Sequence, residues 1–424
     1  MDFARSADPA VQRQLDRLAA LSPGRDILGL ERISALLARL GHPERRLPPV
    51  FHVAGTNGKG STCAVLRAAA EAAGLVAHVY TSPHLVRFNE RIRLAGTLID
   101  DPLLAALLAE ALDAAGDIGP SFFEVTTAAA FLAFARTPAD LAIIEVGMGG
   151  RLDATNAIPG AAICGIAALG LDHQAFLGTT LGAIAGEKAG IARAGTGIVT
   201  LAYPDEAEAS IDAMVAARGA RRIRRGRDWD VTISGDRLAY RDAAGTLDLP
   251  LSALAGPHQA ENAGLAVAML RHQRAVAVPD DALARGLEAV RWPARLQRLG
   301  HGPVARVETW LDGGHNPSAA SAIAAHFAGH PPLDVVIGML ANKDAETFLG
   351  LIRPVARRVI AVPVEGHDHH APADLAAMAR AMGLDGATAP DLPAATAGLA
   401  GPVLITGSLY LAGVALDLNG EPPR

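Results

Sequence analysis

The fold is decided by the stretch Phe51-His52-Val53-Ala54-Gly55-Thr56-Asn57-Gly58-Lys59-Gly60-Ser61-Thr62. An apolar strand runs into a glycine-rich loop with a single lysine, and an alanine-rich helix over Ala64–Ala73 follows. Glycines let backbone amides turn inward, and the positive end of the following helix favours a polyphosphate. The loop departs from the ordinary P-loop because Gly60 separates Lys59 from Ser61. We therefore predict a phosphate-binding loop, and the alternative is a tight turn between strand and helix.

Length, charge and cysteine content limit the class of protein. At 424 residues the chain is too long for one ordinary hydrophobic core, so we expect two domains. The net charge of −6 gives no electrostatic reason to expect binding to nucleic acid or to a membrane. Arginines cluster between Arg221 and Arg227, and we interpret them as a solvated edge strand. Two isolated cysteines and the lack of a signal or transmembrane pattern lead us to expect a cytoplasmic, soluble protein. We separately expect a monomer.

Alternating apolar strands and helices predict a doubly wound, P-loop-containing α/β domain over residues 1–292 and a Rossmann-like domain over residues 293–424, joined at Arg291–Ala294. The strands expected in the first domain are Val50–Ala54, Val76–Tyr80, Leu141–Val146, Ala161–Leu169 and Gly197–Leu201, with a small antiparallel meander over Arg221–Leu249 (near 221–250). Its expected helices are Ala10–Leu21, Leu28–Leu40, Asp101–Ala115, Phe122–Arg136, Thr180–Ala192, Asp205–Arg218, His258–Leu270 and Asp280–Val290. In the second domain we expect strands at Ala305–Leu311, Val335–Met339, Val359–Val364 and Val403–Ile405, and helices at Ser318–Phe327, Ala345–Pro354, Ala373–Met382 and from about Ser408.

Polar residues follow several of these strands, at the sheet edge where doubly wound domains bind ligands. Glu145 closes a buried apolar strand, which suggests an acid linked to Mg²⁺; the alternative is a carboxylate bonded to a loop. His173 follows the next strand, where a lone histidine is more often structural than a ligand. Taken by itself, Lys188 beside Glu187 favours a surface ion pair.

Together, these motifs resemble the bifunctional dihydrofolate synthase/folylpolyglutamate synthase family, relatives of the Mur ligases, from about Leu28 to Gly413. The matching motifs are Ala-Gly-Thr-Asn-Gly-Lys-Gly-Ser (54–61), Ser-Pro-His-Leu (82–85), Phe-Phe-Glu (122–124), Glu-Val-Gly-Met-Gly-Gly-Arg-Leu-Asp-Ala-Thr-Asn (145–156), Leu-Asp-His followed by Leu-Gly (171–178), Glu-Lys-Ala-Gly-Ile (187–191), Arg-Leu-Gln (295–297), Asp-Gly-Gly-His-Asn-Pro (312–317) and Gly-Met-Leu-Ala-Asn-Lys-Asp (338–344). The glycine between lysine and serine is the variant of the folate branch.

The resemblance implies a Mur ligase-like N-terminal domain, a C-terminal glutamate ligase domain and an ATP-dependent amide ligase. A carboxylate of dihydropteroate, or of a folate's terminal glutamate, attacks the γ-phosphate of ATP. The amine of L-glutamate then attacks the acyl phosphate. The implied cofactors are ATP and Mg²⁺ at two sites, with a monovalent cation as a further candidate. The implied partners are these small substrates.

Carried over position by position, the resemblance assigns catalytic roles to Lys59, Glu145, His173 and Lys188. It assigns ATP contacts to Thr56, Asn57, Gly58, Lys59, Gly60, Ser61, Asn262, Arg295, Asp312 and His315. Metal contacts fall on Ser82, Glu145, His173 and Lys188, the lysine in carbamylated form. The pterin pocket falls on Ile27, Leu28, Gly29, Phe123, Glu124, Leu152, Asp153 and Ala154, and the glutamate site on Lys343, Asp344 and Ser408.

Two other functions stay open at this point. The first is a ligase that only extends polyglutamate tails, because it would share every catalytic motif. The second is a nucleotide-dependent switch without ligase activity. A switch would need an Asn-Lys-x-Asp guanine motif, and the nearest match, Asn342-Lys343-Asp344-Ala345, lacks the last aspartate.

Overall fold

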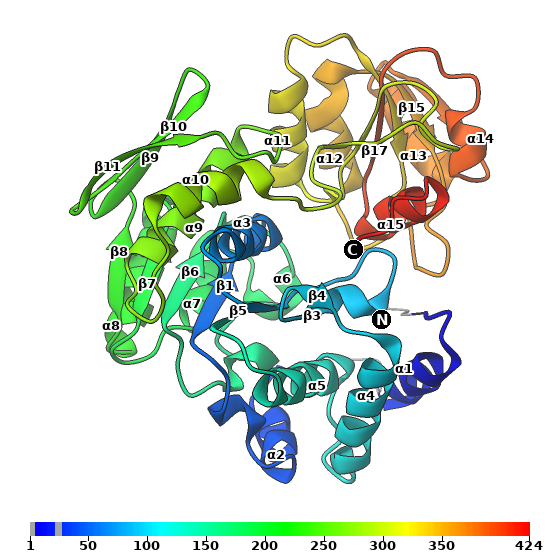
Figure 1. Cartoon of the computed structure of the whole chain (residues 1–424). Helices are drawn as coiled ribbons and strands as arrows, with labels where there is room; N and C mark the ends of the chain where they lie inside the picture. Colours follow the sequence, from blue (N-terminus) through cyan, green and yellow to red (C-terminus); the bar gives the residue numbers. More distant parts are fainter. Residues whose placement is uncertain (1–4, 22–27) are drawn as a thin grey trace. The chain divides into compact units, whose positions relative to one another are not determined.

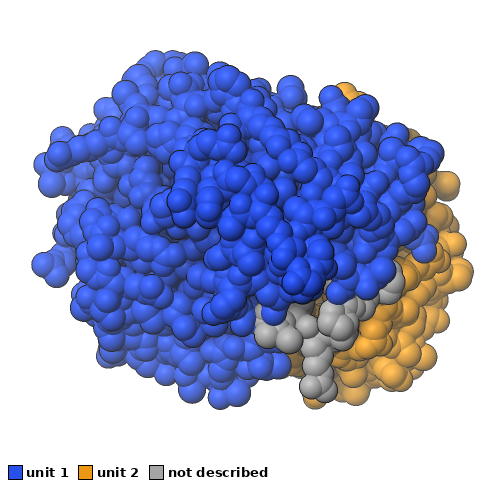
Figure 2. Space-filling model, turned by 90° about the horizontal axis from the view of Figure 1, so that it is seen from below, with its two compact units in different colours: residues 1–83, 88–253, 259–290 blue, residues 84–87, 254–258, 291–424 orange. Residues whose placement is uncertain are grey.

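The computed structural model describes residues 5–21 and 28–424. The chain forms two compact units, coloured separately in Figure 2. Unit 1 contains residues 1–83, 88–253 and 259–290, and unit 2 contains residues 84–87, 254–258 and 291–424. Two short segments therefore belong to unit 2 although unit 1 precedes and follows them. The predicted boundary between residues 292 and 293 stays a prediction.

An eight-stranded sheet forms the centre of unit 1 (Figure 1). Its order is β4-β3-β2-β5-β1-β6-β7-β8, and neighbours pair in parallel except for the antiparallel pairs β2–β3 and β3–β4. The strands are β1 Val50–Ala54, β2 Ala77–Tyr80, β3 Ile92–Leu94, β4 Thr97–Leu98, β5 Leu141–Glu145, β6 Ile163–Ile166, β7 Gly197–Thr200 and β8 Arg221–Arg224. The predicted parallel strands are thus confirmed, because strands covered on both faces read as continuous apolar runs.

The predicted meander over Arg221–Leu249 was wrong in its first part. Residues 221–224 form β8, which pairs in parallel with β7 at the end of the large sheet. This confirms the arginine-rich edge strand, and the helix between β7 and β8 allows the parallel pairing. The separate antiparallel sheet contains only β9 Trp229–Ser234, β10 Arg237–Asp242 and β11 Gly245–Pro250.

Helices surround the large sheet and bury apolar side chains against it. They are α1 Pro9–Leu21, α2 Glu31–Arg39, α3 Lys59–Ala72, α4 Asp101–Ala115, α5 Phe122–Arg136, α6 Gln174–Leu177, α7 Leu181–Ala189, α8 Asp205–Ala217, α9 His258–Arg271 and α10 Asp280–Ala289, with 3-10 turns at Pro43–Arg45, Phe88–Arg91 and Ala154–Ala157. One cluster joins α1, α2, α4 and α5, and another joins α7 and α8 to β6 and β7. In the described part of the chain, no helix is both long and apolar enough to cross a membrane.

Unit 2 contains a second, mainly parallel sheet of order β12-β13-β17-β14-β15-β16, in which only β12 is antiparallel to its neighbour. Its strands are β12 Gln297–Arg298, β13 Thr309–Leu311, β14 Leu333–Ile337, β15 Ala356–Ala361, β16 Asp385–Thr388 and β17 Val403–Thr406. Its helices are α11 Pro317–Phe327, α12 Ala345–Ile352, α13 Pro372–Ala381, α14 Leu392–Thr396 and α15 Leu409–Leu418, with a 3-10 turn at Arg353–Val355.

The predicted second α/β sheet is confirmed, with one strand shortened. The strand expected over Ala305–Leu311 begins only at Thr309, because Ala305 closes a tight turn with Gly302. The sequence analysis did not predict the short β12, β16 or α14.

Candidate active site

The glycine-rich loop joins β1 to α3, and the helix begins at Lys59, earlier than the Ala64 that we expected. Lys59, Gly60 and Ser61 therefore lie in the first turn, where an α-helix leaves backbone N–H groups without partners inside the helix. Gly58 precedes the helix with φ of 82° and provides no side-chain cap. A side chain on Gly58 would collide with the Asn262 amide on α9. The fold thus brings Gly58 and Asn262 together, as their shared assignment to ATP requires.

The first part of the loop is held by the segment that follows β6. The backbone N–H groups of Thr56 and Asn57 donate to the carbonyl of Ala168 at 2.8 and 3.1 Å. The Thr56 hydroxyl donates to the Gly170 carbonyl at 3.0 Å. These two loop amides are therefore engaged within the protein. A phosphate would meet the N–H groups that follow them, from Gly58 to Ser61.

Charged and polar groups from the ends of three strands converge on this helix start. Lys59 Nζ lies 3.9 Å from Glu145 Oε1, and it also donates to the Thr56 carbonyl at 3.3 Å. The Ser82 N–H, after β2, donates to Glu145 Oε2 at 3.4 Å. The Ser61 hydroxyl is buried and has no hydrogen-bond partner among the described residues. An unpaired buried hydroxyl costs free energy, so a ligand that bonds to Ser61 would remove this cost.

The donors near Glu145 fit a magnesium–nucleotide complex better than a metal centre made by protein alone. Among residues 5–21 and 28–424, no group of three or more His, Cys, Asp or Glu side chains is placed to hold a metal ion. Mg²⁺ in nucleotide enzymes is held through one or two carboxylates together with substrate phosphates. Glu145 and the Ser61 hydroxyl supply this kind of donor set.

Lys188 is buried on α7, with 4% of its surface exposed, so the interpretation as a surface ion pair was wrong. Its Nζ donates to the Gly55 carbonyl at 2.8 Å, which places it directly behind the loop. Burial, together with the nearby positive charge of Lys59, lowers the pKa of the Lys188 amine to about 7. The neighbouring Glu187 pairs with Arg151 at 2.8 Å instead. An amine that is neutral near pH 7 is a nucleophile, which suits carbamylation.

His173 follows β6 and precedes α6, with a backbone φ of 51°. The residue is exposed, and its backbone N–H donates to Asp172 Oδ1 at 2.9 Å. The metal role of His173 stays a prediction.

The residues assigned to the pterin pocket divide into two groups. Phe123 at the start of α5 lies against Gly147, and its ring centroid is 6.0 Å from that of Tyr80. Leu28 and Gly29 are half-buried just before α2. The pterin contacts of Phe123, Leu28 and Gly29 stay a prediction. Ile27 lies outside the described residues.

Glu124 and Asp153 are both buried and bonded to backbone. Glu124 Oε2 accepts from Ser121 N at 2.6 Å and from Arg32 Nε at 3.0 Å, and with the Ser121 side chain it forms a capping box at the start of α5. Asp153 accepts from Met148 N at 2.8 Å and Thr155 N at 3.0 Å, and it fixes the loop that follows Glu145. Burial raises the pKa of the Asp153 carboxyl, and these hydrogen bonds oppose the rise.

The loop after Glu145 also makes a contact with His52 that the sequence analysis missed. Leu152 and Ala154 flank Asp153, half-buried and buried respectively. The Thr155 hydroxyl donates to Asp153 Oδ1 at 2.5 Å and lies 2.9 Å from His52 Nε2 on β1. A buried histidine in a strand reads as an ordinary core position, so no local signal marks this link.

In unit 2, the turn after β13 brings Arg295, Asp312 and His315 together. Asp312 accepts from Leu296 N at 2.8 Å and Gly314 N at 2.7 Å. Burial raises the pKa of the Asp312 carboxyl, and the positive charge of Arg295 opposes this. His315 Nδ1 lies 3.0 Å from the Gly313 carbonyl. Their ATP contacts stay a prediction.

The residues assigned to the glutamate site lie at helix starts of unit 2. Asp344 Oδ1 accepts from Thr347 N at 3.0 Å and caps α12. The Ser408 hydroxyl accepts from Tyr410 N at 3.1 Å and caps α15. The Lys343 carbonyl lies 2.8 Å from His370 Nε2. These contacts explain the structural role of Asp344 and Ser408, and their binding role stays a prediction.

Several known proteins similar to this chain share one enzyme name, although no family model matches the chain. The dihydrofolate synthase/folylpolyglutamate synthase of Escherichia coli is 37% identical over 343 residues, which cover 80% of this chain and 78% of that protein. The structure of E. coli FolC in complex with DHPP and ADP has a TM-score of 0.87, with 33% identity over 97% of each chain. A bifunctional folylpolyglutamate synthase/dihydrofolate synthase with Mn, AMPPNP and L-glutamate bound has a TM-score of 0.85, with 30% identity over 98% of this chain and 99% of that one.

Proposed function

The chain belongs to the dihydrofolate synthase/folylpolyglutamate synthase family, and we propose that it carries out both reactions of that name. It is an ATP-dependent ligase. In the first reaction it joins L-glutamate to dihydropteroate, and in the second it joins L-glutamate to the terminal glutamate of a folate. Each reaction activates a carboxylate as an acyl phosphate, which the glutamate amine attacks, giving ADP and phosphate.

The proposed roles follow from charge and position. Two anions must approach each other when a carboxylate attacks a phosphate, so the phosphate charge must be neutralised and held in line. Lys59 supplies a fixed positive charge, and the N–H groups at the start of α3 supply hydrogen-bond donors. Asn262 lies against the loop and would contact the nucleotide. We also assign ATP contacts to Arg295, Asp312 and His315.

Metal and substrate roles complete the proposal. Glu145, Ser61 and Ser82 would hold the first Mg²⁺, and Glu145 with His173 the second. When bound, Mg²⁺ neutralises phosphate charge and orients the reacting groups. Phe123, Leu28 and Gly29 would contact the pterin, and Lys343 the incoming glutamate. We place the reaction in the cytoplasm, because Cys63 and Cys164 are both free.

The observation that carries the proposal is the meeting of Lys59, Glu145 and the unpaired Ser61 hydroxyl at one helix start. The test is Glu145→Ala, assayed with dihydropteroate, ATP and labelled glutamate. We expect turnover to be lost and the circular dichroism spectrum to be unchanged. The matched control is Glu110→Gln, which removes a carboxylate paired with Arg136 on the surface and should leave turnover unchanged. Full activity of Glu145→Ala would refute the assignment.

A second assay separates the bifunctional enzyme from a ligase that only extends tails. The wild-type chain is given either dihydropteroate or tetrahydrofolate, each with ATP and labelled glutamate. We expect labelled product from both acceptors. Product from tetrahydrofolate alone would remove the first reaction from the proposal and leave the second.

We further propose that Lys188 is carbamylated in the active enzyme. The support is its burial, its neutral amine near pH 7 and its position behind the loop. Native mass spectrometry in bicarbonate buffer should show an added mass of one carbon dioxide that Lys188→Met lacks. An identical mass for the two chains, apart from the substitution, would contradict this assignment.

A further inference from the structure

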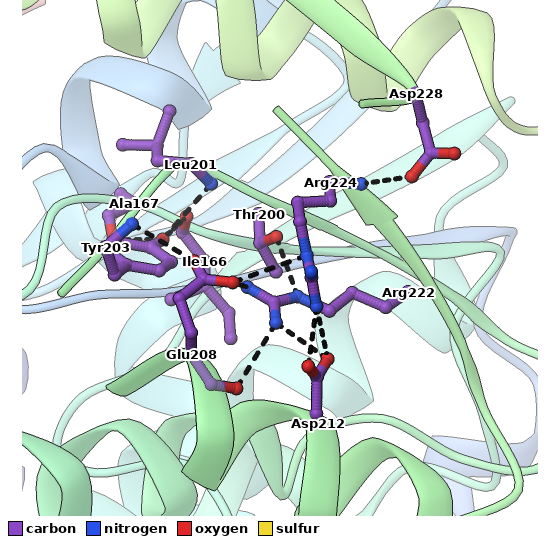
Figure 3. A network of polar contacts seen from close by, with 10 residues as sticks. All are labelled: Ile166, Ala167, Thr200, Leu201, Tyr203, Glu208, Asp212, Arg222, Arg224 and Asp228. Atoms are coloured by element: carbon purple, nitrogen blue, oxygen red, sulfur yellow. Dashed lines mark hydrogen bonds and ion pairs between the residues drawn. The ribbon is translucent and has the colours of Figure 1, made fainter. Parts of the chain in front are cut away.

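Tyr203 lies in the loop between β7 and α8, and its hydroxyl makes three backbone contacts, two of them at the end of β6 (Figure 3). It lies 2.6 Å from the carbonyl of Ile166 and 3.0 Å from that of Ala167, and it donates its single proton to this pair of acceptors. It also accepts from Leu201 N at 3.3 Å. Burial raises the pKa of the Tyr203 phenol far above its usual value, so the proton remains in place. Tyr203 thus fixes the backbone at Ile166 and Ala167, where β6 ends; we call these hydroxyl contacts the clamp.

The clamped residues lead directly to the nucleotide loop. Ala167 N donates to the Ala54 carbonyl at 2.8 Å, and the next residue, Ala168, accepts both loop amides. Ala167 also packs so closely on Gly55 that a Cβ there would be 2.9 Å from its own Cβ. A shift of the β6 end would therefore move the first half of the loop.

The other end of Tyr203 is held by a charged network that reaches the sheet edge (Figure 3). Its backbone N–H donates to Glu208 Oε1 at 3.1 Å. Glu208 Oε2 in turn pairs with Arg222 at 2.9 Å and Arg224 at 3.3 Å. Both arginines also pair with Asp212 on α8. The tyrosine is thus fixed to rigid elements at both ends, which is what a positioning group requires.

We propose that Tyr203 is a positioning residue for nucleotide binding, acting through the Ile166–Gly170 segment on the loop. This inference rests on the proposed function and adds a residue that neither contacts the nucleotide nor lies in a motif that the sequence analysis identified. The hydroxyl keeps the loop in the conformation that receives the triphosphate. If fewer molecules hold the loop in this conformation, the apparent affinity for the nucleotide falls by the same factor.

The test compares two tyrosines that each lose one buried hydroxyl. Tyr203→Phe removes the clamp, and the control Tyr240→Phe removes a hydroxyl that donates to Asp242 on the small antiparallel sheet. We expect Tyr203→Phe to raise KM for ATP by about tenfold, the size expected when a buried bonding group loses its partner. We expect kcat and KM for glutamate to change less than about twofold. Tyr240→Phe should leave all three constants unchanged. An unchanged KM for ATP in a folded Tyr203→Phe would overturn the proposal.

Hydrogen exchange on the wild-type chain provides a test that does not depend on a variant folding. Coupling between sites is reciprocal, so nucleotide binding should stabilise the clamp as well as the loop. Adding AMPPNP with Mg²⁺ should slow exchange at Leu201 N together with Thr56 N and Asn57 N. Slower exchange in the loop alone would overturn the proposal. If wild type binds no AMPPNP at all, the proposed function fails instead, so the two failures are distinguishable.

Discussion

Each unit contains a parallel strand that turns into a helix, and the two turns are built in opposite ways. In unit 2, the Asn316 side chain caps α11 and Asp312 accepts two backbone N–H groups. In unit 1, Gly58 gives α3 no side-chain cap, and the Ser61 hydroxyl has no partner in the described chain. The unit 2 turn thus bonds these polar side chains to its own backbone, whereas the unit 1 turn leaves the Ser61 hydroxyl unbonded within the described chain. The difference supports the proposed phosphate site at the unit 1 turn independently of the glycine pattern.

The largest effect should come from the charge at the unit 1 turn. Lys59→Met should lower kcat/KM for ATP by about 10³ and leave the melting temperature nearly unchanged, because Lys59 acts on developing charge. The comparable change in unit 2, Arg357→Met, leaves Asp334 buried without its guanidinium partner and should lower the melting temperature instead. Steady-state kinetics and thermal unfolding check both. Activity of Lys59→Met within about tenfold of wild type would break the comparison.

The next effect is a pH dependence from Lys188 in CO₂-free buffer. Its pKa is about 7 in the folded chain and 10.5 when unperturbed, so the unfolded state holds the extra proton between these values. The stability of the wild-type chain relative to Lys188→Met should therefore rise as pH increases from about 7 to about 10.5. Urea unfolding across this range measures it. A constant difference would show that the buried amine is not neutral there.

A pair of glycine substitutions compares crowding at equal backbone strain. Gly58 and Gly383 both have φ of 82°, but only Gly58 has a neighbour, Asn262, in the path of a side chain. Alanine at a left-handed position costs roughly 1–2 kcal/mol. Gly383→Ala should show this cost alone, and Gly58→Ala should be less stable still and bind ATP more weakly. Equal unfolding free energies for the two variants would contradict the packing of Asn262 on the loop.

The smallest effects should separate the two helix starts directly. Asn316→Ala should lower stability by about 1 kcal/mol, the usual size for losing a helix cap, with no change in ATP affinity. Ser61→Ala should leave the stability of the ligand-free chain unchanged, because its hydroxyl is unpaired, and should weaken ATP binding. Calorimetric titration and denaturant unfolding check both. A loss of stability in Ser61→Ala would mean that this hydroxyl has a partner in solution.

Much of this architecture was predictable because buried parallel strands are continuous apolar runs and carry their own signal. Glu145 was found in the same way, as an acid closing such a run. The start of α3 at Lys59 was not, because glycines such as Gly60 are poor helix formers and the local pattern favours a loop. Tertiary contacts override that preference here.

The burial of Lys188 and the role of Tyr203 could not be predicted from the local sequence, because both depend on distant partners. Lys188 looked like half of a surface pair because Glu187 is its neighbour, and its burial follows from how α7 packs behind the loop. Tyr203 stands in a loop without a motif, and its hydroxyl meets carbonyls at Ile166 and Ala167, far away in the chain. No local pattern encodes either contact.

The arginine-rich strand β8 also bears on the behaviour of the protein in crowded solution. A strand that ends a sheet offers unpaired backbone groups on which another molecule's strand could assemble, and charged side chains discourage such aggregation. Arg222 and Arg224 are tied to α8, whereas Arg221 is exposed at the rim. The arginines of β8 that support the backbone at Tyr203 thus also place, on this sheet edge, the kind of charge that disfavours edge-to-edge assembly.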